Sequence, residues 1–417
     1  MKSICIPCSG PVDTEALLPV IDHPLFQRLR HCRQLGLNEL VFPGAQHTRF
    51  EHAVGVLARV RKSAGFALAD DVGRRNLEVF ALLHDIGHGP YSHQIEPVLR
   101  QDHHQHGLKC LQEMAEAIAQ CGADPAAVAA LLEERDADAA WVADRNLGAD
   151  KLDYLQRDAF HLGLSGVPDL DLLQRQTVRV DGGGLALQEK FIEDGKRVQK
   201  FYSYLHQHGY LNKTALIAQR ILQRAAYEEL MIGALDEETV WRYTDEQLAE
   251  RLAHSRLPLV RELLRRLRER RLYRTALCVK PEGYLYVENT AGKAIALSQW
   301  PRRRLAQFSK AVQSMERLKA LEDELADLLG LAPGKVLLAA MPYFKKLLPR
   351  DLRIANGANG DFWLFDQDRD HKASLESDYL RTFAIRIAVP EERREAAVAA
   401  RSRLEEALAC LADGEQR

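Results

Sequence analysis

Apolar residues recur at helical spacing through most of the first 270 positions, and this periodicity constrains the fold more than any other feature. It predicts helices at residues 15–36, 48–68, 75–84, 107–121, 125–134 and 148–161, and again from about 192 to 272. Around Asp181-Gly182-Gly183-Gly184 the pattern is interrupted, and residues 177–187 are typical of a small hairpin. We therefore expect a helical domain over residues 1–275.

The pattern changes after Arg274. Strand-like segments at residues 277–287, 335–340, 362–365 and 383–389 are interspersed with helical segments at 309–329 and 391–411. This mixture predicts a smaller α+β domain over residues 276–417. The expected fold class is thus mainly α, with a helical core and a smaller α+β C-terminal domain.

Composition excludes several classes of protein. The 57 Lys and Arg residues are balanced by 59 Asp and Glu, which argues against a polycation that coats nucleic acid. No apolar window reaches the length of a membrane span. Seven cysteines, an odd number, favour reduced thiols and a cytoplasmic protein. Cys5 and Cys8 form a lone C-x-x-C pair, which does not by itself predict a zinc site.

Histidine is concentrated in one part of the chain. Ten of the 15 histidines lie between His23 and His106, where uniform scatter would place about three. This excess indicates a metal or phosphate site. The candidate segments are His47-Thr48-Arg49-Phe50-Glu51-His52, His84-Asp85-Ile86-Gly87-His88 with His93 and Glu96, His103-His104-Gln105-His106-Gly107, and residues 150–158 with Asp150, Tyr154 and Asp158 on one helical face.

These segments offer imidazoles and carboxylates together. Two His and two Asp form a ligand set that suits Mn²⁺, Fe²⁺, Zn²⁺ or Mg²⁺. A metal with open positions acidifies a bound water and polarises a phosphoryl oxygen. Arg49 and Lys151 supply positive charge for a phosphate, and His88, His93 and His104 are able to donate to phosphate oxygens or to move a proton. The residues alone predict metal-assisted phosphoester hydrolysis, and we expect Gly87 and Gly89 to allow a sharp turn beside the site.

The same segments resemble those of the HD-domain deoxynucleotide triphosphohydrolases, the group of the SAM-and-HD-domain dNTPases and their bacterial relatives. The resemblance extends to residues 21–30, 34–36 and 41–45, and it covers about residues 20–275. One departure lies at Ile6-Pro7-Cys8-Ser9-Gly10, where the family commonly carries Asp-Pro-x-His-Gly. That stretch contributes to nucleotide contacts between subunits in the family, so its absence bears on activation and assembly.

The resemblance implies a role for each matching residue. The metal ligands would be His52, His84, Asp85 and Asp150. The triphosphate would be contacted by Arg49, Lys151, His88 and His104. His93 would be the general acid, oriented by Glu96. The deoxyribose would be held by Gln34, Leu35, Tyr154 and Asp158, with Tyr210 lining the sugar or base pocket.

The resemblance also implies an activity and partners. The expected reaction is metal-dependent hydrolysis of a dNTP to deoxynucleoside and inorganic triphosphate, with Mn, Fe, Mg or Zn as cofactor and room for a second Mg²⁺ with the nucleotide. It implies a homo-oligomer, a tetramer or a dimer, activated by a guanine nucleotide. The residues that would hold this activator are Asp22, Gln27, Arg30, Arg270 and Arg274.

Two alternative functions stay open at this stage. One is an HD phosphohydrolase acting on another nucleotide, such as a monophosphate or an alarmone. The other is a regulatory protein that binds nucleic acid through residues 261–274, which contain seven arginines, and through residues 302–304. Nucleic acid is therefore a secondary candidate partner, and no membrane partner is expected.

Overall fold

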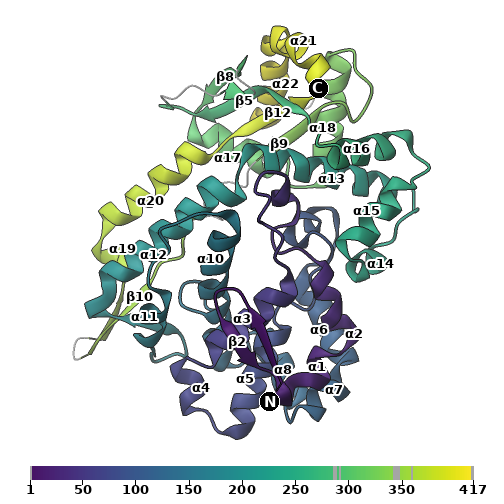
Figure 1. The fold of residues 1–417 in the computed structure, drawn as a ribbon. Coiled ribbons are helices and arrows are strands. Elements are labelled where there is room, and N and C mark those ends of the chain that lie inside the picture. Colours follow the sequence, from purple (N-terminus) through teal and green to yellow (C-terminus); the bar gives the residue numbers. More distant parts are fainter. Residues whose placement is uncertain (1, 285–288, 291–292, 341–347, 358–359, 415–417) are drawn as a thin grey trace. The chain divides into compact units, whose positions relative to one another are not determined.

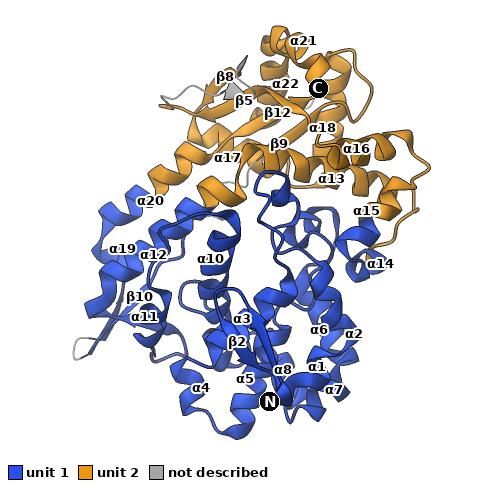
Figure 2. Cartoon of the chain, viewed as in Figure 1, with its two compact units in different colours: residues 1–205, 238–248, 349–375 blue, residues 206–237, 249–348, 376–417 orange. Residues whose placement is uncertain are grey.

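The chain forms two compact units in the computed structural model, which describes residues 2–284, 289–290, 293–340, 348–357 and 360–414. The first unit comprises residues 1–205, 238–248 and 349–375, and the second comprises 206–237, 249–348 and 376–417 (Figure 2). These units are interleaved in sequence, whereas a single division at residue 275 was expected from the change of pattern. That division stays a prediction about domain organisation.

Helices dominate the first unit (Figure 1). Its helices include α1 (Leu18–Ile21), α2 (Pro24–Arg28), α3 (Arg49–Val60), α4 (Ala64–Leu68), α5 (Asp71–Leu83), α6 (His103–Glu113), α7 (Ala115–Gln120), α8 (Pro125–Leu132), α9 (Ala140–Ala143), α10 (Ala149–Leu162), α11 (Leu170–Arg175) and α12 (Ile192–Leu205). Short 3-10 turns at Leu29–His31, Gly36–Leu40, Ser92–Gln94 and Glu96–Val98 connect them. The predicted mainly α class is confirmed.

Two small sheets belong to the first unit. Strands β1 (Ser3–Ile6) and β2 (Gly10–Asp13) form an antiparallel hairpin that contains the departure from the family pattern. Strands β3 (Thr177–Arg179) and β4 (Leu185–Gln188) form the hairpin predicted around residues 181–184. They extend into a four-stranded sheet of order β11-β10-β4-β3, in which β10 (Arg353–Asn356) runs parallel to β4 and β11 is Gly360–Trp363.

The second unit is α+β. Its sheet has the order β8-β5-β12-β9, formed by Ala296–Trp300, Arg274–Pro281, Ile385–Val389 and Leu337–Ala340. The sheet is antiparallel except for the parallel pair β5 and β8. Its helices include α13 (Lys213–Met231), α16 (Pro258–Arg268), α17 (Arg302–Ala311), α18 (Met315–Leu328), α21 (Arg394–Ala399) and α22 (Arg401–Asp413). The strand expected at 277–287 ends at Pro281, and residues 285–287 lie outside the described part of the chain.

The single helix expected at residues 15–36 is wrong. The chain instead forms α1, α2 and two 3-10 turns, with a break at His23. Pro24 follows, and a residue before proline is pushed out of the helical region into extended backbone. His23 accordingly has φ −65° and ψ 136°, and its ring nitrogen caps the new helix by accepting from the Leu25 N–H. The helix expected at 48–68 is likewise split into α3 and α4, and the Ser63 side chain caps α4 by accepting from the Phe66 N–H.

Helices α3, α5 and α10 form the buried centre of the first unit, and Gly55 sets the distance between α3 and α10. A Cβ atom at Gly55 would overlap the guanidinium of Arg157 and the carboxylate of Asp153. A mid-helix glycine costs roughly 0.5–1 kcal/mol relative to alanine. Glycine at position 55 therefore lowers the stability of the helix itself. In return, its small size lets α10 approach closely enough for Asp153 and Arg157 to pack against α3.

Within the described residues, no helix has both the length and the apolar character needed to cross a membrane.

We predict that Gly55→Ala destabilises the protein by about 1–3 kcal/mol, the usual cost of overpacking a tightly packed interior. The free energy of unfolding from urea titration measures the effect. Gly73→Ala is the matched control, because Gly73 is also helical but its nearest neighbour would lie 3.1 Å from an added Cβ atom, against 2.1 Å at Gly55. Equal stability of the two variants would show that α3 and α10 are not packed as described.

Candidate metal centre

Three helix ends bring the expected metal ligands together. Helix α3 starts at Arg49, capped by the Thr48 hydroxyl, and presents His52 one turn later. Helix α5 ends where His84 begins, so that Asp85 leaves the helix beside it. Helix α10 has Asp150 in its first turn, where a carboxylate is favoured by the helix dipole. Residues that lie 98 positions apart in the sequence thus meet at one point.

Four side-chain atoms converge there. His52 Nε2 lies 3.1 Å from Asp150 Oδ1 and 3.6 Å from Asp85 Oδ2. His84 Nε2 lies 3.7 Å and 3.4 Å from the same two oxygens. Ligands about 2.1 Å from a tetrahedral ion are separated by about 3.4 Å. The four nitrogen-to-oxygen distances are therefore close to the edge length of a coordination polyhedron, and the ligand atoms of His52, His84 and Asp85 all lie within 4.8 Å of one another.

Hydrogen bonds on the far side of each ring set the tautomers. The Nδ1–H of His52 donates to Asp153 Oδ2 at 2.9 Å, and the Nδ1–H of His84 donates to the Ala81 carbonyl at 2.9 Å. Each neutral ring therefore turns an Nε2 lone pair toward the carboxylates of Asp85 and Asp150. Lone pairs facing anions repel, so this arrangement calls for positive charge at Nε2, supplied by a bound metal ion or by a ring proton. The residues present fit a divalent metal.

The electrostatics indicate the same demand for positive charge. Burial alone would lower the pKa of His84, yet the carboxylates of Asp85 and Asp150 raise it to about 10. Despite burial, the Arg49 guanidinium and two histidines hold the pKa of Asp85 well below its usual range. Arg49 is itself buried, pairs with Asp85 Oδ2 and donates from Nε to the Ser92 hydroxyl at 2.8 Å. The site thus keeps its carboxylates ionised and ready to bind a cation.

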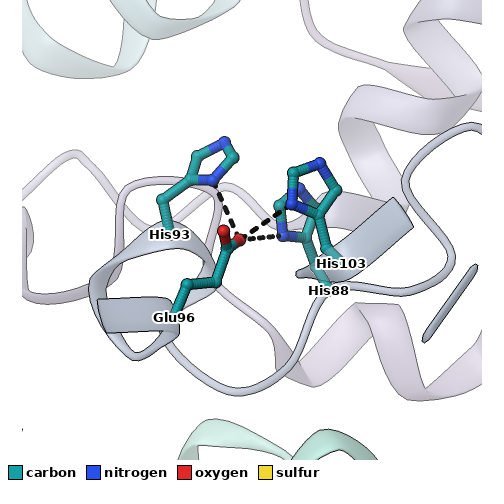
Figure 3. A group of neighbouring side chains, drawn as sticks. All are labelled: His88, His93, Glu96 and His103. Carbon is teal, nitrogen blue, oxygen red and sulfur yellow. Dashed lines mark hydrogen bonds and ion pairs between the residues drawn. The ribbon is translucent and has the colours of Figure 1, made fainter. Parts of the chain in front are cut away.

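A second group of side chains surrounds Glu96 (Figure 3). The Nδ1 atoms of three rings lie around its Oε1 atom, His93 at 2.9 Å, His88 at 3.1 Å and His103 at 3.0 Å. Although burial opposes ionisation, these rings hold the pKa of Glu96 well below its usual range. The side chain of His93 is 64 % exposed, whereas that of His88 is fully buried. His93 is therefore the ring that a bound substrate would meet.

The loop that carries this group is held in an unusual conformation. Tyr91 and Ser92 both have left-handed backbone, with φ of 58° and 54°, which costs energy in a residue other than glycine. The Tyr91 N–H donates to Asp245 Oδ1 at 2.6 Å, and the Ser92 hydroxyl donates to the Arg33 carbonyl at 2.7 Å. Arg28 donates to the carbonyls of Ile86 and His88. These contacts fix where His93 emerges.

Gly87 acts through close packing. Residues 84–87 form a turn where one was expected, although neither Gly87 nor Gly89 has positive φ. A Cβ atom at Gly87 would overlap the backbone of His103 and Gly107 at the start of α6. The glycine thereby allows His103 to reach Glu96.

Gln34 and Asp158, two of the residues expected at the sugar, are connected through His47. The Gln34 N–H donates to the His47 carbonyl at 3.0 Å, and His47 Nε2 lies 2.7 Å from Asp158 Oδ1. Gln34 is buried, and its side-chain Oε1 has no hydrogen-bond partner within the described residues. Leu35 follows directly and is half-buried.

The remaining expected residues are placed as follows. Lys151 is buried, with Nζ 3.2 Å from the ring centre of Tyr202 and 5.3 Å from that of Tyr154. His104 is exposed, so that His103 and not its neighbour joins the group at Glu96. Tyr210 belongs to the second unit, where its ring packs edge-on against His206.

The residues expected at a regulatory nucleotide fall in both units. In the first, Asp22 and Arg30 are exposed, and Arg30 lies over the Phe50 ring and donates to Gln27. In the second, Arg270 is exposed and Arg274 pairs with Glu391.

Sequence reasoning assigned no role to several supporting residues. Asp153 orients His52 and is itself held by Arg157, whose Nε and Nη2 donate to its two oxygens at 2.8 and 2.9 Å. His103, Asp245 and His47 were also missed as partners of site residues. Asp153 and Arg157 had a signal, because an i, i+4 pair of opposite charge follows the expected ligand Asp150 on one helix. Asp245 had none, since it comes from a distant segment.

Comparisons with known proteins agree with this geometry. A family model described as the HD domain matches residues 49–160, and one described as the HD associated region matches residues 203–293. The chain is 31% identical over 226 residues to the uncharacterized protein MJ1154 of Methanocaldococcus jannaschii, covering 53% of this chain and 48% of that one. It is 28% identical over 354 residues to the deoxynucleoside triphosphate triphosphohydrolase SAMHD1 of Gallus gallus, covering 68% and 57%.

A solved phosphohydrolase structure from Bacteroides thetaiotaomicron has a TM-score of 0.69 at 19% identity, covering 94% of this chain and all of that one. At this identity the likeness shows the fold alone. The chain spans about half the length of the curated relatives it matches. Residues 49–160 thus match the HD domain, and the expected similarity to the HD-domain dNTPases is confirmed.

We predict that Asp153→Asn weakens Mn²⁺ binding about 10–100-fold, because His52 loses the charged partner that fixes its tautomer. Calorimetric titration of metal-free protein measures the affinity. Asp171→Asn is the matched control, since Asp171 is a half-exposed aspartate that pairs with Arg59 and Lys62 away from the ligands. Unchanged Mn²⁺ affinity in Asp153→Asn would contradict the assigned role of the His52–Asp153 hydrogen bond.

Proposed function

We propose that this HD-domain protein hydrolyses deoxynucleoside triphosphates to deoxynucleoside and inorganic triphosphate. The observation that carries the proposal is the cluster of His52, His84 and Asp85, with Asp150 in contact with both histidines, beside the oriented pair His93–Glu96. A cation site next to an exposed imidazole with a carboxylate partner suits phosphoester cleavage. The name of the chicken relative, a deoxynucleoside triphosphate triphosphohydrolase, supports the choice of substrate.

The proposed reaction divides the work among the residues. A bound metal would polarise a phosphoryl oxygen and lower the pKa of a water. Water attacks the α-phosphorus, the bond from phosphorus to the 5′-oxygen breaks, and His93 gives a proton to that oxygen as it leaves. Glu96 holds the imidazolium of His93 in place, because it accepts from Nδ1 and leaves Nε2 for the leaving group. Arg49, Lys151, His88 and His104 would neutralise the triphosphate.

Specificity for a deoxy sugar would come from Gln34, Asp158 and Tyr154. The unpartnered Oε1 of Gln34 is buried, and such a group favours a ligand that donates a hydrogen bond. A sugar hydroxyl is a suitable donor, and Asp158 would accept from the 3′-hydroxyl beside it. The ring of Tyr154 would occupy the space that a 2′-hydroxyl needs. Leu35 completes the proposed pocket.

The rival functions are supported less well. Arginines of the basic segment in the second unit are engaged within the protein: Arg266 pairs with Glu262 and Glu392, and Arg268 pairs with Glu250. This pairing reduces the positive charge available to nucleic acid. Action on a monophosphate or an alarmone stays an alternative, and product analysis separates it because only the proposed reaction releases inorganic triphosphate.

We predict that incubation with each dNTP and Mn²⁺ releases deoxynucleoside and triphosphate, and that His93→Ala lowers kcat by roughly 10²–10⁴-fold, the usual contribution of a general acid. Chromatography of products and steady-state kinetics measure both. His254→Ala, a change at an exposed histidine of the second unit, is the control and should keep wild-type kinetics. Release of orthophosphate or pyrophosphate in place of triphosphate would contradict the proposed cleavage position.

We also propose regulation by a guanine nucleotide that promotes a homo-oligomer. Asp22 and Arg30 are exposed, and an aspartate is able to accept from the guanine amino and imino groups. An activator that binds the oligomer more tightly must promote assembly by linkage. We expect GTP or dGTP to increase both the mass measured by light scattering and the turnover of a second dNTP, and Arg30→Ala to abolish both responses. A mass and rate indifferent to nucleotide would leave a constitutive enzyme.

A further inference from the structure

The group around Glu96 has a geometry that hydrogen bonding does not explain. Three imidazole nitrogens lie 2.9–3.1 Å from one oxygen atom (Figure 3). A carboxylate oxygen has two lone pairs and does not accept three N–H groups well. Only the His93 contact has the directions of a hydrogen bond, whereas Nδ1 of His88 and of His103 have no such partner within the described residues.

The distances fit a coordination polyhedron instead. The four candidate atoms lie within 4.8 Å of one another. Ligands about 2.0–2.1 Å from a tetrahedral zinc ion are about 3.3 Å apart, close to the three observed nitrogen-to-oxygen distances. Small rotations of exposed His93 would bring its nitrogen into the remaining position.

The second ring nitrogen of His88 contacts a ligand of the first centre. The Nε2 atom of His88 lies 3.2 Å from Asp85 Oδ1. A neutral imidazole has one N–H and one lone pair, so a proton on Nε2, the side near Asp85, leaves the Nδ1 lone pair facing Glu96, although the Nε2 contact also lacks the directions of a hydrogen bond. A ligand histidine typically directs its other N–H to a carboxylate in this way. Because His88 is fully buried, neither nitrogen has water as an alternative partner.

We propose that His88, His93, His103 and Glu96 form a second divalent transition-metal site, distinct from the centre at His52, His84, Asp85 and Asp150. Three imidazoles and one carboxylate favour Zn²⁺ or Co²⁺ over Mg²⁺, which prefers oxygen ligands. The two centres are connected, because His88 contacts a ligand of the first through Nε2 and would bind the second ion through Nδ1. An ion at the second site takes up Nδ1 of His93 together with Glu96.

This binding has a consequence that rests on the proposed function. A metal on Nδ1 prevents His93 from carrying two ring protons, so the ring no longer serves as a proton donor. Zn²⁺ at the second site therefore inhibits hydrolysis while the first centre stays loaded. The metal site itself is independent of that function, since its ligands bind whether or not a nucleotide is cleaved.

The test counts metal ions bound by full-length protein. We expect metal-free wild type to take up two Zn²⁺ per chain by elemental analysis, and Co²⁺ to give the strong visible absorption of a four-coordinate site. Glu96→Gln and His93→Ala should each bind one Zn²⁺ and lose the part of the absorption that belongs to the second site. His104→Ala removes the neighbouring exposed histidine and should still bind two. Excess Mg²⁺ should leave the Co²⁺ absorption unchanged.

The outcomes separate this proposal from the proposed function. A single Zn²⁺ per wild-type chain, or two in both Glu96→Gln and His93→Ala, would overturn the second site. Circular dichroism identifies a variant that has unfolded. His93→Ala is expected to stay folded, because the His93 side chain is mostly exposed. Two ions without release of triphosphate would overturn the hydrolase proposal and support the metal site. Triphosphate release with one ion would do the reverse.

Discussion

The close approach of α3 and α10 is the constraint on which the site depends. At Gly55 the two helices are near enough for Arg157 and Asp153 to lie beneath α3 with almost no exposure. Asp153 then reaches His52, and the same helix start brings Asp150 to the opposite nitrogen of that ring. One glycine thus determines both the position of a ligand and the tautomer that it presents.

Charge is distributed so that the site stays ready for a cation. Asp85 and Asp150 contribute negative charge at the centre, and Arg49 compensates one of them from the buried side. Burying a pair of opposite charges costs desolvation free energy, so such a pair is expected where the charges have a function. Around Glu96 the balance differs, because three imidazoles share one carboxylate oxygen. The two groups are therefore chemically unlike, although His88 touches both.

The ligands could be predicted from the sequence because they lie in short segments whose residue types already specify chemistry. His52, His84, Asp85 and Asp150 meet as expected, and helix α10 matches its predicted range to within a residue. The prediction of one helix at 15–36 was wrong, because the spacing of apolar residues contains no information on how Pro24 changes the backbone of His23. His103 was passed over for His104, since neighbouring histidines differ only by the direction in which α6 presents them. Asp245 required a tertiary contact that no local pattern contains.

The hydrogen bonds that hold the loop around Tyr91 determine whether the HD domain could be separated from the rest of the chain. Residues 49–160 match the HD family model, yet the Tyr91 N–H is bonded to Asp245, and the carbonyls of Ile86 and His88 are bonded to Arg28. Both partners lie outside the matched segment. Excising it would release the strain stored at Tyr91 and Ser92 and leave His93 without a fixed exit direction. Transferring residues 49–160 to another protein would therefore also require the segments that contain Arg28 and Asp245. The residues that hold this loop in place extend beyond the range of sequence similarity.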